Sequence, residues 1–146
     1  MNSKSKVYFF FPEGAVNLTG RTSLKGFIEK LFKAEKKQIN QINYVFCNDR
    51  TIRKINKQYL NHDYATDIIT FDLSENKLIT ADIYISVERV RENARALGFS
   101  FKSEIHRVIF HGALHLCGYR DKKSAEINKM RGKEDLYLKK YGVSPE

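Results

Sequence analysis

The sequence predicts an α+β fold, in which a single domain holds one mixed sheet of about four strands packed with helices. Two patterns carry this prediction. Apolar residues alternate with polar ones in some segments and recur every three or four positions in others, as strands and helices require. Predicted strands and helices alternate as far as residue 86, and helices alone follow. The 146 residues contain no internal repeat and no linker-like segment, so we expect one domain over residues 1–146.

The first half of the chain is expected to contain two strands and two helices. Residues 7–11 predict an apolar strand. Ser23 is placed to cap a helix that runs through Lys37, because the apolar residues between them recur at helical spacing. A second strand is predicted at residues 42–46, and Asp49 is expected to cap the helix that follows.

A β-hairpin is predicted next. Residues 66–73 and 78–86 read as strands, and the polar segment 74–77 joins them. In the second strand Asp82 lies opposite the apolar side, so it faces either solvent or a cleft. The apolar side of this strand consists of Ile79, Ala81, Ile83 and Ile85.

Three helices are predicted after the hairpin. Ser86 is placed to cap the first, which ends at Gly98 because glycine accepts the left-handed backbone found at helix C-termini. The second helix covers residues 103–117 and is apolar on nearly all sides, so we expect it to be buried at the centre of the domain. The third is a charged helix over residues 122–140.

The chain is strongly basic, with 26 Lys and Arg against 17 Asp and Glu and a formal net charge of +9. Such an excess favours a polyanionic partner, with nucleic acid ahead of an anionic membrane. Scattered solvated lysines are the alternative source of the charge. The densest basic cluster lies on the second predicted helix and forms either a solvated face or a phosphate contact: Arg50, Arg53, Lys54 and Lys57.

Three features bear on the location of the protein. No segment reaches the roughly 20 apolar residues of a membrane span, so we expect no membrane association. Basic residues 4–6 precede an apolar run, as in a secretory signal, but the run is short and ends at Pro12, so we interpret it as a strand. Cys47 and Cys117 do not make a disulfide framework, which fits a cytoplasmic protein.

The central apolar helix carries a metal-binding pattern. His111 and His115 are four residues apart, so both imidazoles lie on one helix face and can reach a single cation. Gly118 ends the helix, and Asp121 follows three residues later. This order repeats the ligand spacing of metzincin proteases, with a carboxylate in the third place. The sequence therefore predicts a metal site formed by His111, His115 and Asp121.

The alternative is that both histidines are structural residues, each with one hydrogen bond. Burying two adjacent imidazoles without partners costs a few kcal/mol, which a bound metal avoids. Two histidines and one carboxylate leave a coordination position open, as in catalytic zinc sites. The pattern therefore favours a metal-assisted hydrolase. The metal-bound water is the one catalytic group that the sequence predicts. Cys117 lies two residues from His115 and is expected to be a small core residue rather than a ligand.

Three blocks of the chain resemble the YbeY endoribonucleases. They are the histidine block at residues 111–121, Thr-Asp-Ile-Ile-Thr-Phe at residues 66–71 and Ala-Asp-Ile-Tyr-Ile-Ser at residues 81–86. The resemblance covers most of the chain. It implies a zinc-dependent, single-strand-specific endoribonuclease that acts in 16S rRNA 3′-end maturation and in ribosome quality control. It further implies Zn²⁺ as cofactor, and ribosomal RNA and the small ribosomal subunit as partners.

The chain departs from the family pattern at two positions. Asp121 stands where the family has a third histidine ligand. An aspartate oxygen still completes a tetrahedral zinc site, but its charge makes the bound water less acidic and favours harder metals. Leu60 stands where the family has an arginine, and the nearest basic replacements by sequence are Arg120 and Arg107.

The expected substrate contacts are basic residues. We expect Arg53 and Lys57 to hold the RNA backbone and Arg120 to lie near the metal. The sequence does not identify a general base, and Asp67 and Asp82 are candidates by chemical type alone.

Two other functions remain open. One is a non-catalytic ribosome-assembly factor whose metal site supports the fold, which Leu60 and Asp121 keep possible. The other is a metalloprotease, suggested by the metzincin-like spacing. Against a protease stand the basic composition and Gly112, which occupies the place of the protease general base.

Overall fold

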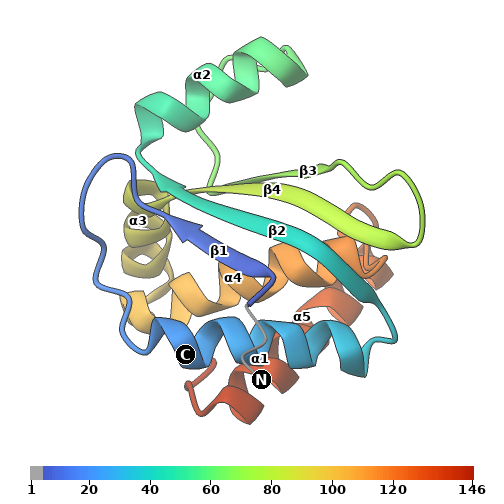
Figure 1. Cartoon of the computed structure of the whole chain (residues 1–146). Coiled ribbons are helices and arrows are strands. Elements are labelled where there is room, and N and C mark those ends of the chain that lie inside the picture. The colour runs from blue at the N-terminus through green and yellow to red at the C-terminus, as the bar shows by residue number, and fades with distance from the viewer. Residues whose placement is uncertain (1–4) are drawn as a thin grey trace.

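A computed structural model describes residues 5–146 and shows a single α+β domain built on a four-stranded sheet (Figure 1). The first four residues of the predicted domain 1–146 lie outside the described residues. The strands are β1 (Val7–Phe10), β2 (Gln38–Cys47), β3 (Ile68–Asp72) and β4 (Leu78–Ser86). The helices are α1 (Arg21–Ala34), α2 (Asp49–Leu60), α3 (Val87–Leu97), α4 (Phe101–Leu116) and α5 (Ser124–Tyr141).

The sheet is mixed, as predicted. Its strand order is β1-β2-β4-β3. β2 pairs in parallel with β1 on one side and with β4 on the other, whereas β3 pairs antiparallel with β4 as the predicted hairpin. Helices α1, α4 and α5 lie on one side of the sheet, and α2 lies on the other side (Figure 1).

The core lies between the sheet and α4, because the apolar side of β4 faces this helix. Four alternate residues of β4 are at most 7% exposed: Ile79, Ala81, Ile83 and Ile85. Tyr44 of β2 is fully buried, and its hydroxyl donates a 2.8 Å hydrogen bond to the carbonyl oxygen of Ile109 on α4. This bond satisfies the one polar atom of a large core side chain.

Two predicted helix starts are wrong. Helix α1 begins at Arg21, because Gly20 adopts a left-handed backbone (φ 61°) that turns the chain into the helix before Ser23 is reached. Helix α2 is capped by Asn48, whose side chain accepts a bond from the Thr51 amide at 2.9 Å. Asp49 lies in the first helical turn instead.

Two further boundaries differ: β2 begins at Gln38, four residues before the predicted strand, and α1 ends at Ala34, three residues before Lys37. The remaining predicted boundaries lie within two residues of those in the structure. Ser86 caps α3 by accepting from the Arg89 amide, and Gly98 ends that helix in a left-handed conformation. Helix α4 begins two residues before the predicted start, because Ser100 rather than Ser103 is its cap. Among residues 5–146, no helix is both long enough and apolar enough to cross a membrane.

Candidate active site

One face of α4 lines the main cavity of the described chain. Its polar residues follow each other at intervals of three, four and four, so they share a side of the helix: Glu104, Arg107, His111 and His115. The rest of the helix is almost entirely buried and packs in the core. The apolar residues of α4 thus hold the helix in the core, and the helical spacing of its four polar residues directs their side chains into the cavity.

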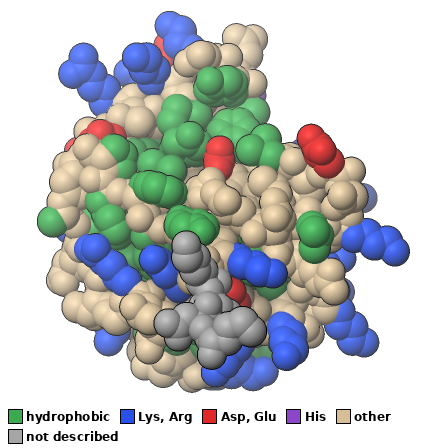
Figure 2. All heavy atoms as spheres, in the orientation of Figure 1, with side chains coloured by type: hydrophobic (Ala, Val, Ile, Leu, Met, Phe, Trp, Pro, Cys, Tyr) green, Lys and Arg blue, Asp and Glu red, His purple; other side chains and the backbone are tan. Residues whose placement is uncertain are grey.

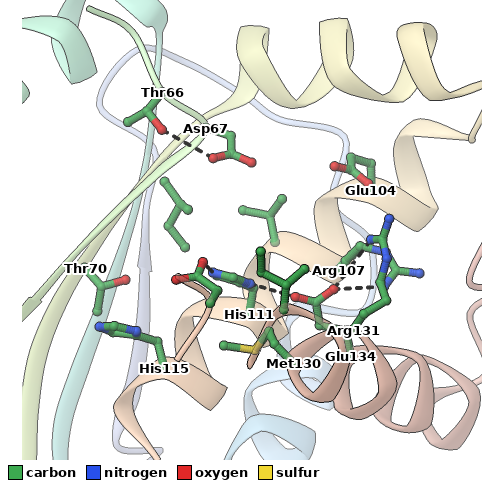
Figure 3. A pocket seen from close by; sticks show the side chains of 14 residues that line it. Thr66, Asp67, Thr70, Glu104, Arg107, His111, His115, Met130, Arg131 and Glu134 are labelled. Carbon is green, nitrogen blue, oxygen red and sulfur yellow. Dashed lines mark hydrogen bonds and ion pairs between the residues drawn. The ribbon is translucent and has the colours of Figure 1, made fainter. Parts of the chain in front are cut away.

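The cavity has a volume of about 520 Å³ and is open to solvent. Helix α4 forms its floor, α5 forms one wall, and β3 with the two residues before it forms the opposite wall (Figure 3). The segment between α4 and α5 contributes Asp121 to the rim. All three predicted metal ligands therefore line the same cavity.

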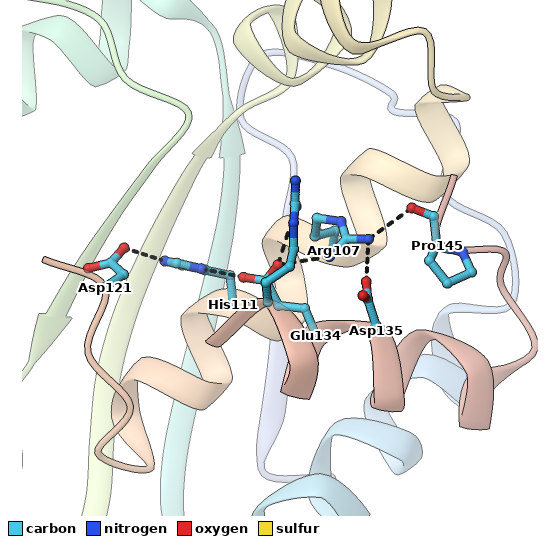
Figure 4. Close-up of polar contacts among 7 residues, drawn as sticks. Arg107, His111, Asp121, Glu134, Asp135 and Pro145 are labelled. Carbon is cyan, nitrogen blue, oxygen red and sulfur yellow. Dashed lines mark hydrogen bonds and ion pairs between the residues drawn. The ribbon is translucent and has the colours of Figure 1, made fainter. Parts of the chain in front are cut away.

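His111 lies at the centre of a polar network. Its Nδ1 donates a 2.7 Å hydrogen bond to Glu134 Oε2, and its Nε2 lies 3.2 Å from Asp121 Oδ2 (Figure 4). Arg107 Nη1 donates to the other oxygen of Glu134 at 2.9 Å. The bond to Glu134 fixes the orientation of the imidazole and leaves Nε2 directed at the rim.

The charges around this network shift its pKa values. Burial lowers the pKa of His111, but the hydrogen bond to Glu134 and the charges of Glu134 and Asp121 outweigh burial and raise it above its ordinary value. Burial raises the pKa of Asp67, which the charge of His111 only partly offsets. The cavity therefore holds a histidine that favours its charged form and a carboxyl that resists ionisation.

The three predicted ligands do not converge in this structure. His115 is exposed, one turn beyond His111 (Figure 3). Within residues 5–146, no group of three or more His, Cys, Asp or Glu side chains is close enough to hold one ion. The structure brings His111 and Asp121 together, and the role of His115 as a ligand stays a prediction.

Three acidic residues of the cavity were not predicted as a group. Asp67 lines it, whereas Asp82, the other candidate base, lies on the opposite side of the sheet and accepts from Asn43. Glu104 and Glu134 line it as well, each only 5% exposed. The helical spacing of Glu104 from His111 is a sequence signal that reveals it. Glu134 has no such signal, because it comes from another helix.

The basic residues of the cavity agree only in part with those expected. Arg107 lines it but is committed to Glu134, to Asp135 at 2.7 Å and to the Pro145 carbonyl. Arg120 lies outside it, beside a smaller depression next to Tyr119. Arg131 of α5, which the sequence did not suggest, lines the cavity with its side chain about half exposed.

The remaining predicted residues lie elsewhere. Arg53 and Lys57 are exposed on α2, and Arg53 pairs with Asp63 at 2.8 Å. They lie outside the cavity. Cys117 is partly buried against the core, away from the cavity lining, and burial raises its pKa to about 12. It is therefore a packed thiol, as expected.

A histidine that has a raised pKa and is held between two carboxylates in an open polar cavity marks a candidate catalytic site. A family model described as Endoribonuclease YbeY matches residues 16–142. The chain belongs to the YbeY endoribonuclease family, as the resemblance of its motifs indicated.

Curated relatives and one solved structure agree with this assignment. Endoribonuclease YbeY of Flavobacterium psychrophilum is 48% identical over 84% of this chain and 87% of its own length. Endoribonuclease YbeY of Cytophaga hutchinsonii is 44% identical over 92% of this chain and 96% of its own length. The solution structure of a Thermotoga maritima protein matches with a TM-score of 0.64 and 26% identity, over 92% of this chain and 91% of that protein.

Proposed function

We propose that this chain is a zinc-dependent endoribonuclease that cuts single-stranded RNA in 16S rRNA 3′-end maturation and in ribosome quality control, in the cytoplasm. The endoribonuclease activity follows from family membership. The metal, the ribosomal substrate and the small-subunit partner are our inference. The observation that carries the metal-dependent reaction is the arrangement of His111 between Glu134 and Asp121.

The chemical types of the three proposed ligands, rather than their positions in this structure, fit a zinc ion. Metal-binding histidines typically donate their second ring N–H to a carboxylate, which is what His111 Nδ1 does with Glu134. Its Nε2, beside Asp121 Oδ2, is thereby left as the atom that would bind the ion after losing its proton. His115 follows on the same helix face. His111, His115 and Asp121 would hold the ion, which would make a water molecule more acidic and neutralise charge on the phosphate.

The other cavity residues have separate tasks. Asp67 lines the wall opposite α5, and its raised pKa suits a carboxylate that accepts a proton from the attacking water near neutral pH. Arg131 is the cavity arginine with an exposed side chain, so it is placed to bind the scissile phosphate in the role that Leu60 cannot fill. Glu134 and Arg107 hold His111 in place.

RNA is the substrate that the charge of the molecule favours. A net charge of +9 attracts a polyanion, and the exposed cations of α2 lie apart from the cavity, where they can contact a chain that extends beyond it. The metalloprotease alternative is weakened by the same charge. The assembly-factor alternative differs from our proposal in predicting RNA binding without cleavage.

The test combines metal content with cleavage. Zinc-loaded protein is expected to cut a single-stranded RNA internally, to leave a duplex RNA and casein intact, and to lose activity in EDTA. His111→Ala should lose both zinc, measured by elemental analysis, and cleavage, whereas the surface variant His62→Ala should keep both. RNA binding without cleavage at full zinc occupancy would support the assembly factor, and cleavage of casein would support a protease.

A further inference from the structure

The side of the sheet opposite α4 carries a row of aromatic side chains that the cavity does not use. We define the aromatic face as Tyr8 and Phe10 of β1, Phe71 of β3, Tyr84 of β4 and Tyr59 of α2. Tyr8, Phe10 and Tyr59 are 39%, 47% and 63% exposed. Figure 2 shows hydrophobic side chains gathered over the strands, below the position of α2.

The strand register brings these residues onto one side. Tyr8 pairs with Asn43, Asn43 with Asp82, and Asp82 with Phe71, so one row crosses all four strands. A second row passes from Phe10 through Val45 to Tyr84. The first row spans three strand spacings, roughly 14 Å at about 4.8 Å each. Aromatic rings therefore lie toward both edges of this side of the sheet, with polar atoms between them.

The rings are already ordered by contacts with each other. Tyr8 and Phe10 are stacked, with centroids 6.5 Å apart and an interplanar angle of 21°. Phe71 makes edge-to-face contacts with Tyr84 at 6.0 Å and with Tyr59 at 5.7 Å. Pre-ordered rings lose little conformational entropy when a planar ligand stacks on them.

The polar atoms between the rings favour bases over phosphates. Asn43 donates from Nδ2 to Asp82 Oδ1 at 3.0 Å, and its amide oxygen accepts from Gln41 Nε2 at 3.0 Å. The other carboxylate oxygen of Asp82 is left to accept bonds from base amino groups. The negative charge of Asp82 repels a phosphate backbone. Bases would therefore lie on the sheet, and the backbone would run along the border.

That border is positively charged. Arg53, Lys54 and Lys57 are exposed on α2, which covers the neighbouring part of the same side of the sheet. Figure 2 shows Lys and Arg side chains above and below the hydrophobic patch. An exposed apolar patch with a cationic border matches a single-stranded nucleic acid, which combines stacking bases with phosphates.

We propose that the aromatic face binds single-stranded RNA by base stacking and holds a segment of the substrate away from the cavity. This inference rests on the proposed function for the identity of the ligand. Duplex RNA is excluded from this face because its bases are already stacked. The face thus offers a structural reason for preference toward single strands.

The absence of tryptophan from the chain makes a direct test possible. Phe10→Trp places the one indole of the protein on the aromatic face, and Leu97→Trp places it at the end of α3, at a comparably exposed position. Metal-free protein is titrated with a short single-stranded RNA and with a duplex of the same length. We expect saturable quenching by the single strand in Phe10→Trp alone.

A second variant measures the contribution to affinity. Tyr8→Thr with Phe10→Thr replaces the rings by β-branched residues, which favour strands, so β1 should be retained. Fluorescence anisotropy should show at least about tenfold weaker binding of single-stranded RNA, since one stacked base contributes about 1–3 kcal/mol. Leu97→Ala should bind as the unaltered chain does. An unchanged affinity in the double variant would contradict the proposal.

The outcomes separate this proposal from the enzymatic one. Anisotropy that reports RNA binding while Phe10→Trp emission stays constant would overturn the aromatic face and leave the endoribonuclease proposal intact. If the emission of Phe10→Trp depends on protein concentration in the absence of RNA, a second copy of the chain covers the aromatic face. This result would also overturn the proposal. Quenching by the single strand with no cleavage after zinc loading would support the face and reject the zinc-dependent reaction.

Discussion

Gly112 allows α4 to lie close to the sheet directly beside His111. A Cβ at this position would come within 3.0 Å of Ile68 Cδ1 and 3.2 Å of Ile83 Cδ1. In the metzincin pattern the same position holds the glutamate that acts as general base. Here the sheet leaves no space for such a side chain, so local packing argues against the protease alternative independently of charge.

We predict that Gly112→Ala destabilises the protein. Overpacking a core costs about 1–3 kcal/mol, which exceeds the gain of about 1 kcal/mol in helix propensity. Gly132→Ala is the matched control, because Gly132 is exposed in α5 and an added Cβ there meets no atom within 4 Å. It should stabilise by about 0.5–1 kcal/mol. Urea unfolding measures both, and equal stabilisation would contradict the close packing at Gly112.

The site residues that the sequence predicted are those that lie close to one another along the chain. His111 and Asp121 belong to one short motif, and both line the cavity. Glu134 was missed because its contact with His111 spans 23 residues and its helix shows no apolar pattern that indicates a buried acid. Long-range polar contacts of this kind follow from how helices pack, which spacing in the sequence does not encode.

Asp121 is the proposed ligand at which this chain leaves its family pattern, so substitutions there test the proposed metal site. Asp121→Asn should weaken zinc binding sharply, because a neutral amide oxygen is a poor zinc donor. Asp121→His should keep or tighten zinc binding, because imidazole suits this metal. Metal titration followed by calorimetry compares these variants with Asp72→Asn, an exposed position on β3. Equal affinities in all four proteins would remove Asp121 from the site.

At the scale of elements, the carboxylate of Glu35 connects α1, α5 and the segment that carries Asp121. Glu35, at the end of α1, accepts a 2.8 Å hydrogen bond from Tyr119 and another from Tyr137 of α5. Lys133 of α5 lies 3.2 Å from the same carboxylate. Burial raises the pKa of Glu35, but the bonds from the two tyrosines and Lys133 outweigh it and leave the pKa below the ordinary 4.5.

The sign of this shift predicts a pH-dependent loss of stability. A carboxyl whose folded pKa is lowered stabilises the protein fully above its unfolded pKa of about 4.5, and this contribution disappears as pH falls through the folded value. Glu35→Gln should therefore cost about 2 kcal/mol at neutral pH and much less in acid. Urea unfolding at several pH values measures the difference.

The control for this prediction is an exposed acid. Glu92 pairs with Arg95 on the surface of α3, with 57% of its side chain exposed. Glu92→Gln should cost no more than about 1 kcal/mol at neutral pH. A Glu35→Gln deficit that stays constant from neutral to acid pH would show that packing, rather than the charge of Glu35, holds the three elements together.

Helix termini show why element boundaries were predicted unevenly. Ser86 and Gly98 fit the expected cap and stop of α3, because their chemistry is local. Ser23 was misassigned since a serine can cap a helix or lie inside its first turns, and Gly20 already provides the turn. Where two neighbouring residues can both cap, as Asn48 and Asp49 can, tertiary contacts decide: Asp49 is held by Ser86 and Arg89.

At the scale of the whole molecule, the periodicity of the sequence predicted the fold class. It did not predict that aromatic side chains from several strands gather on the side of the sheet opposite α4. Alternation in β4 correctly predicted which side is buried. Its residue Asp82 was expected to meet solvent or a cleft, and it lies half-buried on the side of the sheet away from the cavity, within the aromatic face. The strand order determines which side chains meet on this face, because the face is assembled from β1, β3 and β4. The order of these strands depends on chain crossovers, which short sequence patterns do not show.

If the basic charge of the molecule attracts RNA, it does so through individual phosphate contacts, so the position of these contacts can be measured. Arg53→Ala with Lys57→Ala lowers the net charge from +9 to +7 on α2, and Lys139→Ala with Lys140→Ala makes the same change at the end of α5. If α2 contacts the backbone, the first pair should flatten the slope of log affinity against log salt by up to about 1.4, at about 0.7 per single-strand phosphate.

The α5 pair should leave that slope nearly unchanged, because these lysines lie on the other side of the sheet from α2 (Figure 1). Both variants should retain the zinc content of the unaltered chain, since neither touches the cavity. Anisotropy of metal-free protein at several salt concentrations provides the slopes without cleavage. Equal slopes in the two double variants would mean that net charge alone attracts RNA and that α2 is a solvated helix face.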